Sequence, residues 1–427
     1  MTDYCNKTKR TALVLGGTKP HILLIEKLKA RGYHVILVDY LEAPPGAPFA
    51  NAHIRESTLD EKRVLQIAKD TDASLIISTC IDQANCTCCY VAEQLCLPKP
   101  YDHETALNVT DKGRMKRIMA DNGIRTSPFI TVHSVDEIIW DKVRYPAVVK
   151  PVDCNSSKGV HRADCREEVE RFTQEALLLS RSGVASIEGY NTGSEIQVDC
   201  LATEQGASVL LTRMKKRIDS SSGMLLQSTG SILPAPLSEP EAMECAEIAG
   251  KIAAAFHLNN TPFFYQAILT DQGISVLEFA PRIGGGLSYY LIEAITGVDI
   301  IECAIDSFLG IPIRVKKAKN DKVFSTCLLY MHPGVLDHIE GFSELKAAGI
   351  IREAFQLRQN GSSIRGDLRS GNRVGAMVIE AQDYNDLCRK ERLAYDTIRL
   401  CDPSGTDLFN RTLYSMQQKG QFNFELL

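Results

Sequence analysis

The sequence lacks an excess of positive charge and any long apolar run. Its 48 lysines and arginines are outnumbered by 53 aspartates and glutamates, giving a net charge of −5. Such a chain has no overall basic field for nucleic acid or an anionic membrane, so a dedicated DNA-binding protein is disfavoured. No stretch of about 18 uncharged apolar residues predicts a transmembrane helix. The polar start followed by Gly16-Gly17 does not resemble a signal peptide, so we expect a cytosolic protein.

The cysteines and histidines also lack the spacings of common metal and nucleophile sites. Without a signal segment, the fourteen cysteines are expected to stay reduced. The densest group contains no pair of C-x-x-C motifs, and we expect its members to pack like alanines rather than bind metal or act in redox chemistry. They are Cys80, Cys86, Cys88, Cys89 and Cys96. None of the nine histidines forms a metal-binding pair, and no Ser–His–Asp or Cys–His motif is visible.

Repeats and low-complexity segments are absent too, and 427 residues exceed one ordinary domain. The opening predicts a parallel α/β unit with strands at 12–15, 35–39 and 75–78. Its Gly16-Gly17 turn lacks a complete G-x-G-x-x-G, which disfavours a dinucleotide site. We expect Asp39 to be a solvated strand-end carboxylate rather than a ribose ligand.

The pattern of residues changes near residue 110, and this change indicates a domain boundary there. A helix at 111–122 ends at Gly123, and Pro128 then begins a new segment. The remaining pattern mixes helices with strands and contains a hairpin around Asp271-Gln-Gly273. We expect strands at 147–150, 185–188, 195–201, 265–269, 275–279, 323–330 and 374–380, and helices at 166–179, 239–257 and from Tyr384.

Two groups of polar residues suggest a place for a polyphosphate and a cation. Lys150 ends an apolar strand and is followed by the polar loop 155–160, whose hydroxyls and backbone N–H groups suit phosphate. Gln266 and Glu278 lie on the two arms of the predicted hairpin. An oxygen ligand from each strand is a common way to hold Mg²⁺ beside substrate phosphates.

In their order, these segments resemble the ATP-grasp superfamily, and within it carboxylate–amine ligases such as the L-amino acid ligases. The resemblance covers the N-terminal α/β unit and the segments 111–128, 145–151, 156–160, 188–195 and 277–286, the last reading LEFAPRIGGG. It implies an α/β and α+β multidomain chain with the ATP-grasp fold. The implied parts are a Rossmann-like pre-ATP-grasp domain (1–110), an N-terminal subdomain with a lid (111–200), a C-terminal subdomain with the metal hairpin (201–318) and an accessory domain (319–427).

The resemblance also implies a nucleotide site. Lys112 and Lys150 would contact the ATP phosphates or the adenine-side pocket. Glu188 would begin a hinge that contacts adenine, with Tyr190 in the same segment, and Glu195 would bind the ribose hydroxyls. A mobile loop over the β- and γ-phosphates would contain Ser156, Ser157, Lys158 and Gly159, with Lys158 also counted as catalytic.

Metal and catalytic roles follow from the same resemblance. Gln266 and Glu278 would bind Mg²⁺, with Mn²⁺ as the alternative ion, and Arg282 would stabilise the transferring phosphoryl group and contact substrate. Two positions depart from the family: Gln266 stands where many relatives have a carboxylate, and Ala280 where an asparagine is frequent. Glutamine still offers a carbonyl oxygen to a hard cation, though with less charge.

Substrate contacts are expected beside Arg282. The glycine-rich segment that follows it lets the chain turn close to a substrate, and Gly285, Gly286 and Ser288 are the candidates; the alternative is a simple helix-entry turn. Arg213 and Arg217 suit a carboxylate or phosphate or else a solvated face, and Arg213 is preferred as the catalytic candidate because it directly follows a strand.

The sequence thus predicts an ATP-dependent ligase that activates a small carboxylate, such as an amino acid, as an acyl phosphate and joins it to an amine. ATP and Mg²⁺ are its expected cofactors, and small molecules, not nucleic acid or membrane, its expected partners, with a homodimer as the default assembly. Two alternatives stay open: a nucleotide- or cofactor-biosynthesis ligase that uses formate or bicarbonate, and a non-catalytic ATP-binding regulatory protein.

Overall fold

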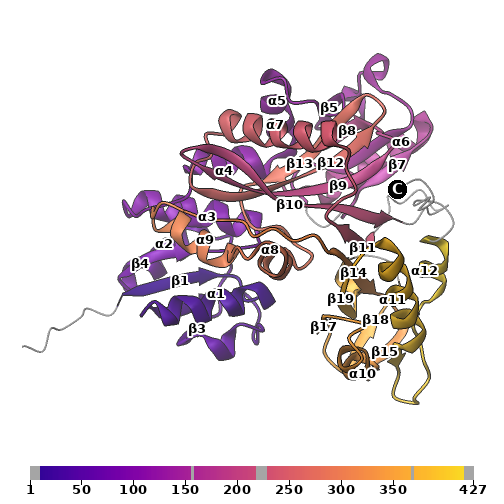
Figure 1. Cartoon of the computed structure of the whole chain (residues 1–427). Helices are drawn as coiled ribbons and strands as arrows, with labels where there is room; N and C mark the ends of the chain where they lie inside the picture. Colours follow the sequence, from indigo (N-terminus) through magenta and orange to yellow (C-terminus); the bar gives the residue numbers. More distant parts are fainter. Residues whose placement is uncertain (1–9, 155–157, 218–227, 367–369, 418–427) are drawn as a thin grey trace, which may run out of the picture.

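A computed structural model of the chain describes residues 10–154, 158–217, 228–366 and 370–417 (Figure 1). Its first unit is a parallel sheet in the order β3-β2-β1-β4. All five residues of β1 are buried, as expected for a parallel sheet that helices cover. The elements are β1 (Thr11–Leu15), α1 (Lys19–Ala30), β2 (His34–Val38), η1 (Ala47–Phe49), β3 (Ala52–Ile54), α2 (Glu61–Asp70), β4 (Ala73–Ile77) and α3 (Asp82–Gln94).

Asp39 closes the turn after β1. Its side chain is buried and accepts hydrogen bonds from the backbone N–H groups of Gly17, at 2.7 Å, and Leu41, at 2.9 Å. The expectation of a solvated carboxylate was therefore wrong. The sequence pattern missed this role because the hydrogen bond to Gly17 joins two strand ends that lie 22 residues apart.

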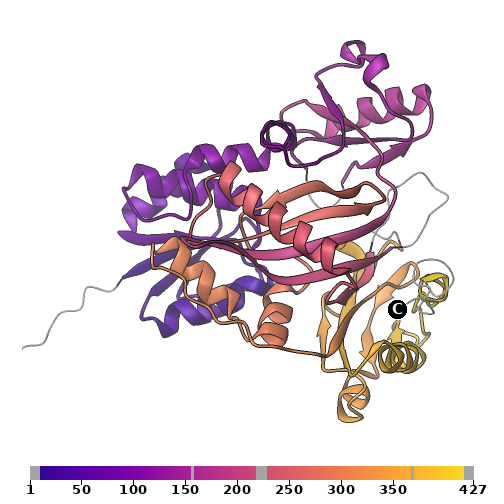
Figure 2. The same cartoon turned by 45° about the horizontal axis from the view of Figure 1, so that its top comes forward.

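A smaller lobe follows the linking helices α4 (His103–Thr110) and α5 (Lys112–Asp121). It consists of an antiparallel sheet in the order β5-β8-β6-β7 and helix α6, and Figure 2 shows it standing apart from the rest of the chain. Val149, Val169 and Ile187 belong to a hydrophobic core of its own. The elements are β5 (Phe129–Val132), η2 (Val135–Glu137), η3 (Trp140–Lys142), β6 (Ala147–Pro151), β7 (His161–Ala163), α6 (Arg166–Leu179) and β8 (Ala185–Gly189).

The largest sheet is eight-stranded, in the order β13-β12-β9-β10-β11-β14-β19-β17. Its first strands are β9 (Ser194–Thr203), β10 (Gly206–Arg217), β11 (Ser228–Leu233), β12 (Thr261–Thr270) and β13 (Gly273–Ala280). Strand β11 pairs antiparallel with β14 (Val323–Leu329), with Gly230 opposite Cys327 and Leu233 opposite Phe324. This pairing makes the strands on either side of residue 319 one continuous sheet.

The remaining helices and strands surround this sheet. They are α7 (Glu239–Ala255), α8 (Ser288–Thr296), α9 (Ile300–Phe308), β15 (Gly334–Leu336), β16 (His338–Glu340), α10 (Phe342–Ala347), β17 (Glu353–Gln356), β18 (Ser362–Ile364), η4 (Ser370–Asn372), β19 (Gly375–Ala381), α11 (Tyr384–Thr397), β20 (Arg399–Cys401) and α12 (Thr412–Gln417). Within the described ranges, no helix is both long and apolar enough to cross a bilayer.

The expected mixed α/β and α+β architecture is confirmed. Helix α6 has the expected bounds, and the hairpin arms are longer than expected, at Thr261–Thr270 and Gly273–Ala280. The sequence pattern missed the short strand β3. The four domain ranges stay predictions, although β9 places residues 194–203 in the large sheet rather than in the smaller lobe.

Candidate active site

A cavity of about 430 Å³ lies where the small lobe, the large sheet and the N-terminal unit meet. This volume falls within the range of roughly 300–1,000 Å³ typical of small-molecule sites. Residues from all three parts line it. Among those expected from the sequence, the cavity is lined by Lys112, Lys150, Glu188, Tyr190, Glu195, Gln266, Glu278, Arg282 and Gly285.

Glu188 on β8 is the charged centre of the small-lobe side. Its carboxylate lies 2.8 Å from Lys150 Nζ and 3.0 Å from Lys116 Nζ, and Ser186 Oγ donates to it at 3.0 Å. Burial opposes its ionisation, but the charges of the two lysines outweigh that effect and lower the pKa of Glu188 to about 2. Glu188 is therefore ionised and holds Lys150 at the cavity wall.

Glu195 on β9 is paired in a similar way on the large-sheet side. It lies 2.5 Å from Lys215 Nζ and 3.3 Å from Arg217 Nη1, both on β10. Burial opposes the charge of Glu195, and the two cations nevertheless lower its pKa. All three side chains line the cavity, so a ligand meets a carboxylate flanked by two cations.

Gln266 and Glu278 lie directly opposite each other on the hairpin of β12 and β13. Since paired residues of an antiparallel ladder share a face, both side chains line the cavity together. Lys112, the first residue of α5, has its Nζ 3.6 Å from Glu278 Oε2 and donates to the carbonyl of Cys154 at 2.9 Å. A carboxylate and an amide carbonyl on one face suit Mg²⁺, with Lys112 placed for phosphate.

Arg282 makes two hydrogen bonds to Asp82 at the start of α3, Nε to Oδ1 at 2.6 Å and Nη2 to Oδ2 at 2.7 Å. Its guanidinium also lies over the ring of Phe264, 5.0 Å from the centroid. Burial acts against its charge, yet Asp82 raises the pKa of Arg282 above its ordinary value. Asp82 and Arg282 both line the cavity and present opposite charges side by side.

The glycine-rich segment after Arg282 is held from behind by a buried polar network. Arg213 Nη2 donates to Asp199 Oδ2 at 2.5 Å and to Ser288 Oγ at 2.8 Å, while Ser288 Oγ donates to the carbonyl of Gly285 at 2.9 Å. Of these residues, only Gly285 lines the cavity. Arg213, Gly286 and Ser288, expected to contact substrate or reacting groups, instead lie outside the cavity lining. Arg213 forms a buried ion pair with Asp199, whereas Arg217 lines the cavity.

A model of the ATP-grasp domain matches residues 143–289, which include β6, β8, the metal hairpin and Arg282. Among solved structures, an L-amino acid ligase from Bacillus licheniformis superposes with a TM-score of 0.79 at 20% identity, covering 91% of this chain and 98% of that one. Residues 143–289 thus form an ATP-grasp domain, and the chain has the fold of the ATP-grasp superfamily.

Other comparisons point to different relatives of this superfamily. A phosphoribosylglycinamide synthetase from Anaerococcus prevotii superposes with a TM-score of 0.73 at 17% identity, covering 92% of this chain and all of that one. The multifunctional protein ura1 of Schizosaccharomyces pombe is 22% identical over 302 residues, which are 68% of this chain and 13% of the relative. The chain thus spans only about one eighth of that protein. At identities this low, the structural similarity establishes the ATP-grasp fold and leaves the substrate open.

The loop that was expected to cover the phosphates is described in part. Ser156 and Ser157 lie outside the described residues. Lys158 is exposed and, like Gly159, does not line the cavity, whereas their neighbour Val160 does. Gly159 has a φ of +70°, and a Cβ there would lie 2.6 Å from Leu179 Cδ1, so the loop turns at a position that glycine alone suits.

Several charged residues in or beside the cavity were not predicted from the sequence. Lys116, fully buried, pairs with Glu188 and lies one helical turn after Lys112, which is a spacing the sequence displays. Lys215 alternates with Arg217 on β10, a strand-like spacing. Asp82 and Arg373 come from outside the matched domain, and no local pattern marks them.

Proposed function

We propose that this ATP-grasp enzyme activates the carboxylate of an amino acid as an acyl phosphate and joins it to an amine, releasing ADP and phosphate. The observation that carries the proposal is the pairing of Asp82 with Arg282 inside the cavity, beside the metal hairpin. An amino acid carries one ammonium and one carboxylate, and this pair offers a partner for each. The substrate would exchange with an existing salt bridge, so no charge is left unpaired.

The expected chemistry explains the remaining residues. A carboxylate is a poor acylating agent until its oxygen has taken the γ-phosphoryl group of ATP. Lys112 and Lys150 would hold phosphate oxygens, and Arg282 would stabilise the phosphoryl group as it transfers. Mg²⁺ held by Gln266 and Glu278 would supply further positive charge there.

Water must be excluded while the acyl phosphate waits for the amine. The small lobe runs from Phe129 to Gly189, of which residues 155–157 lie outside the described ranges. It has its own core and contributes Lys150, Glu188 and Gly189 to the cavity wall, and Tyr190 follows it directly. We assign this lobe the role of a lid that closes over the nucleotide. The amine then attacks the carbonyl carbon, and phosphate leaves.

A ligase that acts on a phosphate-bearing intermediate is the second candidate, favoured by the similarity to the phosphoribosylglycinamide synthetase. Such a substrate needs cations beyond those that ATP uses. In the described cavity lining, Arg217 and Lys215 are paired with Glu195, and Arg282 is paired with Asp82. Arg373 also lines the cavity and donates to Tyr330 Oη. The pairing of Lys215, Arg217 and Arg282 supports the amino acid over the phosphorylated substrate. A cytosolic location and a homodimer stay predictions from the sequence.

Chromatography of the nucleotide products tests the proposal. The protein is incubated with ATP, Mg²⁺ and pools of amino acids, with and without simple amines, and separately with bicarbonate or formate. ADP that forms only with an amino acid pool supports the ligase. ADP that forms with bicarbonate or formate alone supports the biosynthetic alternative. AMP with pyrophosphate overturns the mechanism, and ATP binding without turnover in any pool supports a regulatory protein.

A further inference from the structure

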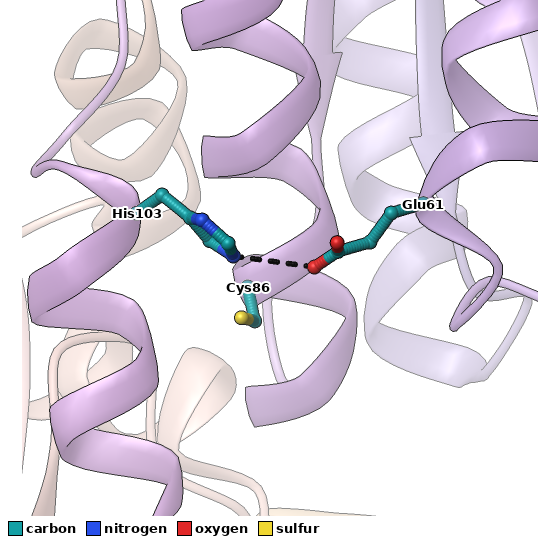
Figure 3. A group of neighbouring side chains, drawn as sticks. All are labelled: Glu61, Cys86 and His103. Atoms are coloured by element: carbon teal, nitrogen blue, oxygen red, sulfur yellow. Dashed lines mark hydrogen bonds and ion pairs between the residues drawn. The ribbon is translucent and has the colours of Figure 1, made fainter.

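Three potential metal ligands meet on the N-terminal unit, away from the ATP-grasp cavity. Glu61 begins α2, Cys86 lies in the middle of α3 and His103 begins α4. Figure 3 shows the three side chains converging, with the dashed line joining His103 Nε2 to Glu61 Oε1 at 3.2 Å. One ligand atom from each residue lies within 4.8 Å of the other two. None of the three residues lines the ATP-grasp cavity.

The face of helix α3 that carries Cys86 also contacts His103 and holds it in place. Tyr90, one turn further along α3, packs its ring edge-on against the His103 ring, with centroids 5.3 Å apart. Glu93 Oε1 accepts a hydrogen bond from the backbone N–H of His103 at 2.8 Å. Two neighbours of Cys86 on one helix therefore fix the start of α4, which is how surrounding contacts orient a ligating histidine.

The charges around the group favour a cation. Among the described residues, Glu61 and His103 form an ion pair with each other and with no third side chain. Cys86 is buried, whereas the side chains of His103 and Glu61 are 21% and 34% exposed. An ion thus has a path from solvent to a thiol that lies beneath a carboxylate and an imidazole.

We propose that Glu61, Cys86 and His103 form a zinc site that ties α2, α3 and α4 together. Sulfur, nitrogen and oxygen ligands are the set that Zn²⁺ takes in tetrahedral sites, with water in the fourth position. Ligand atoms around tetrahedral zinc lie roughly 3.3–3.7 Å apart, given bonds of about 2.0–2.3 Å. His103 Nε2 and Glu61 Oε1 lie 3.2 Å apart, just below this range, so a small outward shift of either side chain would admit the ion.

Binding exchanges a proton for the ion: the Cys86 S–H bond breaks, a Zn–S bond forms, and the proton passes to solvent. Because the ion would bridge three helices, its binding stabilises the folded state over the unfolded one.

A second group, His338, Glu340 and Cys401, has similar spacing and serves as the comparison. There Arg399 Nη1 lies 2.8 Å from Glu340 Oε2, and Asp337 Oδ2 lies 2.7 Å from His338 Nδ1. A guanidinium already neutralises the carboxylate at that place and repels a divalent ion. Zinc is therefore assigned to the group on α2, α3 and α4.

Cobalt substitution tests the site in the full-length protein. Metal-stripped, reduced protein is titrated with Co²⁺, and absorbance is followed in the near ultraviolet, where a thiolate bound to cobalt gives a charge-transfer band. We expect a band that saturates at one equivalent and disappears when Zn²⁺ is added. Zinc should also raise the melting temperature of the wild type.

Matched variants decide which residues bind. Cys86→Ser and His103→Gln should each lose the band and the thermal shift, while Cys96→Ser, at an exposed cysteine of the same segment, and His338→Gln should keep both. Circular dichroism checks that each variant is folded. Absence of the band in the wild type, or its survival in folded Cys86→Ser or His103→Gln, would overturn the zinc site. Neither result depends on ligase activity, so it leaves the proposed function untouched.

Discussion

At the residue scale, the cavity is a set of charges that are paired before any ligand arrives. Glu188 is 3% exposed and its lysine partners are Lys116 and Lys150. Glu188→Gln leaves two buried cations close together without their carboxylate, and we predict a loss of about 3 kcal/mol in the free energy of unfolding. Urea unfolding of the wild type and the variant measures this difference in the free energy of unfolding. The control Glu170→Gln, which removes an exposed pair with Arg166, should change stability by less than about 0.5 kcal/mol.

The same carboxylate gives a pH signature. The pKa of Glu188 is about 2 in the folded protein against an ordinary value of 4.5, so its contribution is complete above pH 4.5 and is lost as the pH falls through 2. The stability difference between wild type and Glu188→Gln should therefore be constant above pH 4.5 and shrink below it. A difference that keeps its size in acid would show that the ion pair is not its source.

Glu278 carries the prediction about catalysis. It lies directly opposite Gln266, and its side chain, which lines the cavity, is 37% exposed. Glu278→Gln should lower kcat by at least about 100-fold, as loss of an electrostatic stabiliser does. ADP release in the presence of the active amino acid pool measures this. An unchanged kcat in a variant that binds ATP normally would remove Glu278 from the metal site.

At the scale of elements, the glycine-rich segment before α8 shows how packing shapes a site. A Cβ on Gly284 would lie 2.5 Å from Gln197 Nε2 and 2.9 Å from Asp199 Oδ1. A Cβ on Gly285 would have no heavy atom within 4 Å. Gly284→Ala should therefore cost about 1–3 kcal/mol of stability by overpacking this buried network. Gly285→Ala is the matched control and should stay close to the wild type in thermal unfolding. Equal melting temperatures for Gly284→Ala and Gly285→Ala would show that Gly284 is not needed for packing.

Elements were also the level at which the sequence was most informative. Apolar periodicity predicted α6 at 166–179 and the pairing of Gln266 with Glu278, because both follow from local patterns. The ion pairs of Lys116 with Glu188 and of Asp82 with Arg282 could not be predicted, since each joins residues 72 to 200 positions apart in the chain. The ion pair of Arg213 with Asp199 is equally remote from any local pattern, because it forms only once β9 and β10 have paired.

At the scale of the whole molecule, the continuous sheet makes the C-terminal region part of the ATP-grasp body. Arg373, just before β19, lines the cavity and donates from Nε to Tyr330 Oη at 2.8 Å. Because β11 and β14 share a ladder, their amides should exchange hydrogen with similar protection, as one cooperative unit. Hydrogen exchange followed by mass spectrometry tests this. Early exchange of β14 and β19 ahead of β11 would instead indicate an independently opening domain.

In the proposed reaction, a substrate carboxylate takes the γ-phosphoryl group of ATP. The most direct measurement uses amino acid pools labelled with ¹⁸O in their carboxylates, together with ATP, Mg²⁺ and an amine. The carboxylate oxygen that attacks ATP bridges carbon and phosphorus in the acyl phosphate and leaves with phosphate. The account therefore predicts one ¹⁸O atom in each phosphate released, alongside ADP. Label in AMP, or unlabelled phosphate released as product forms, would contradict it.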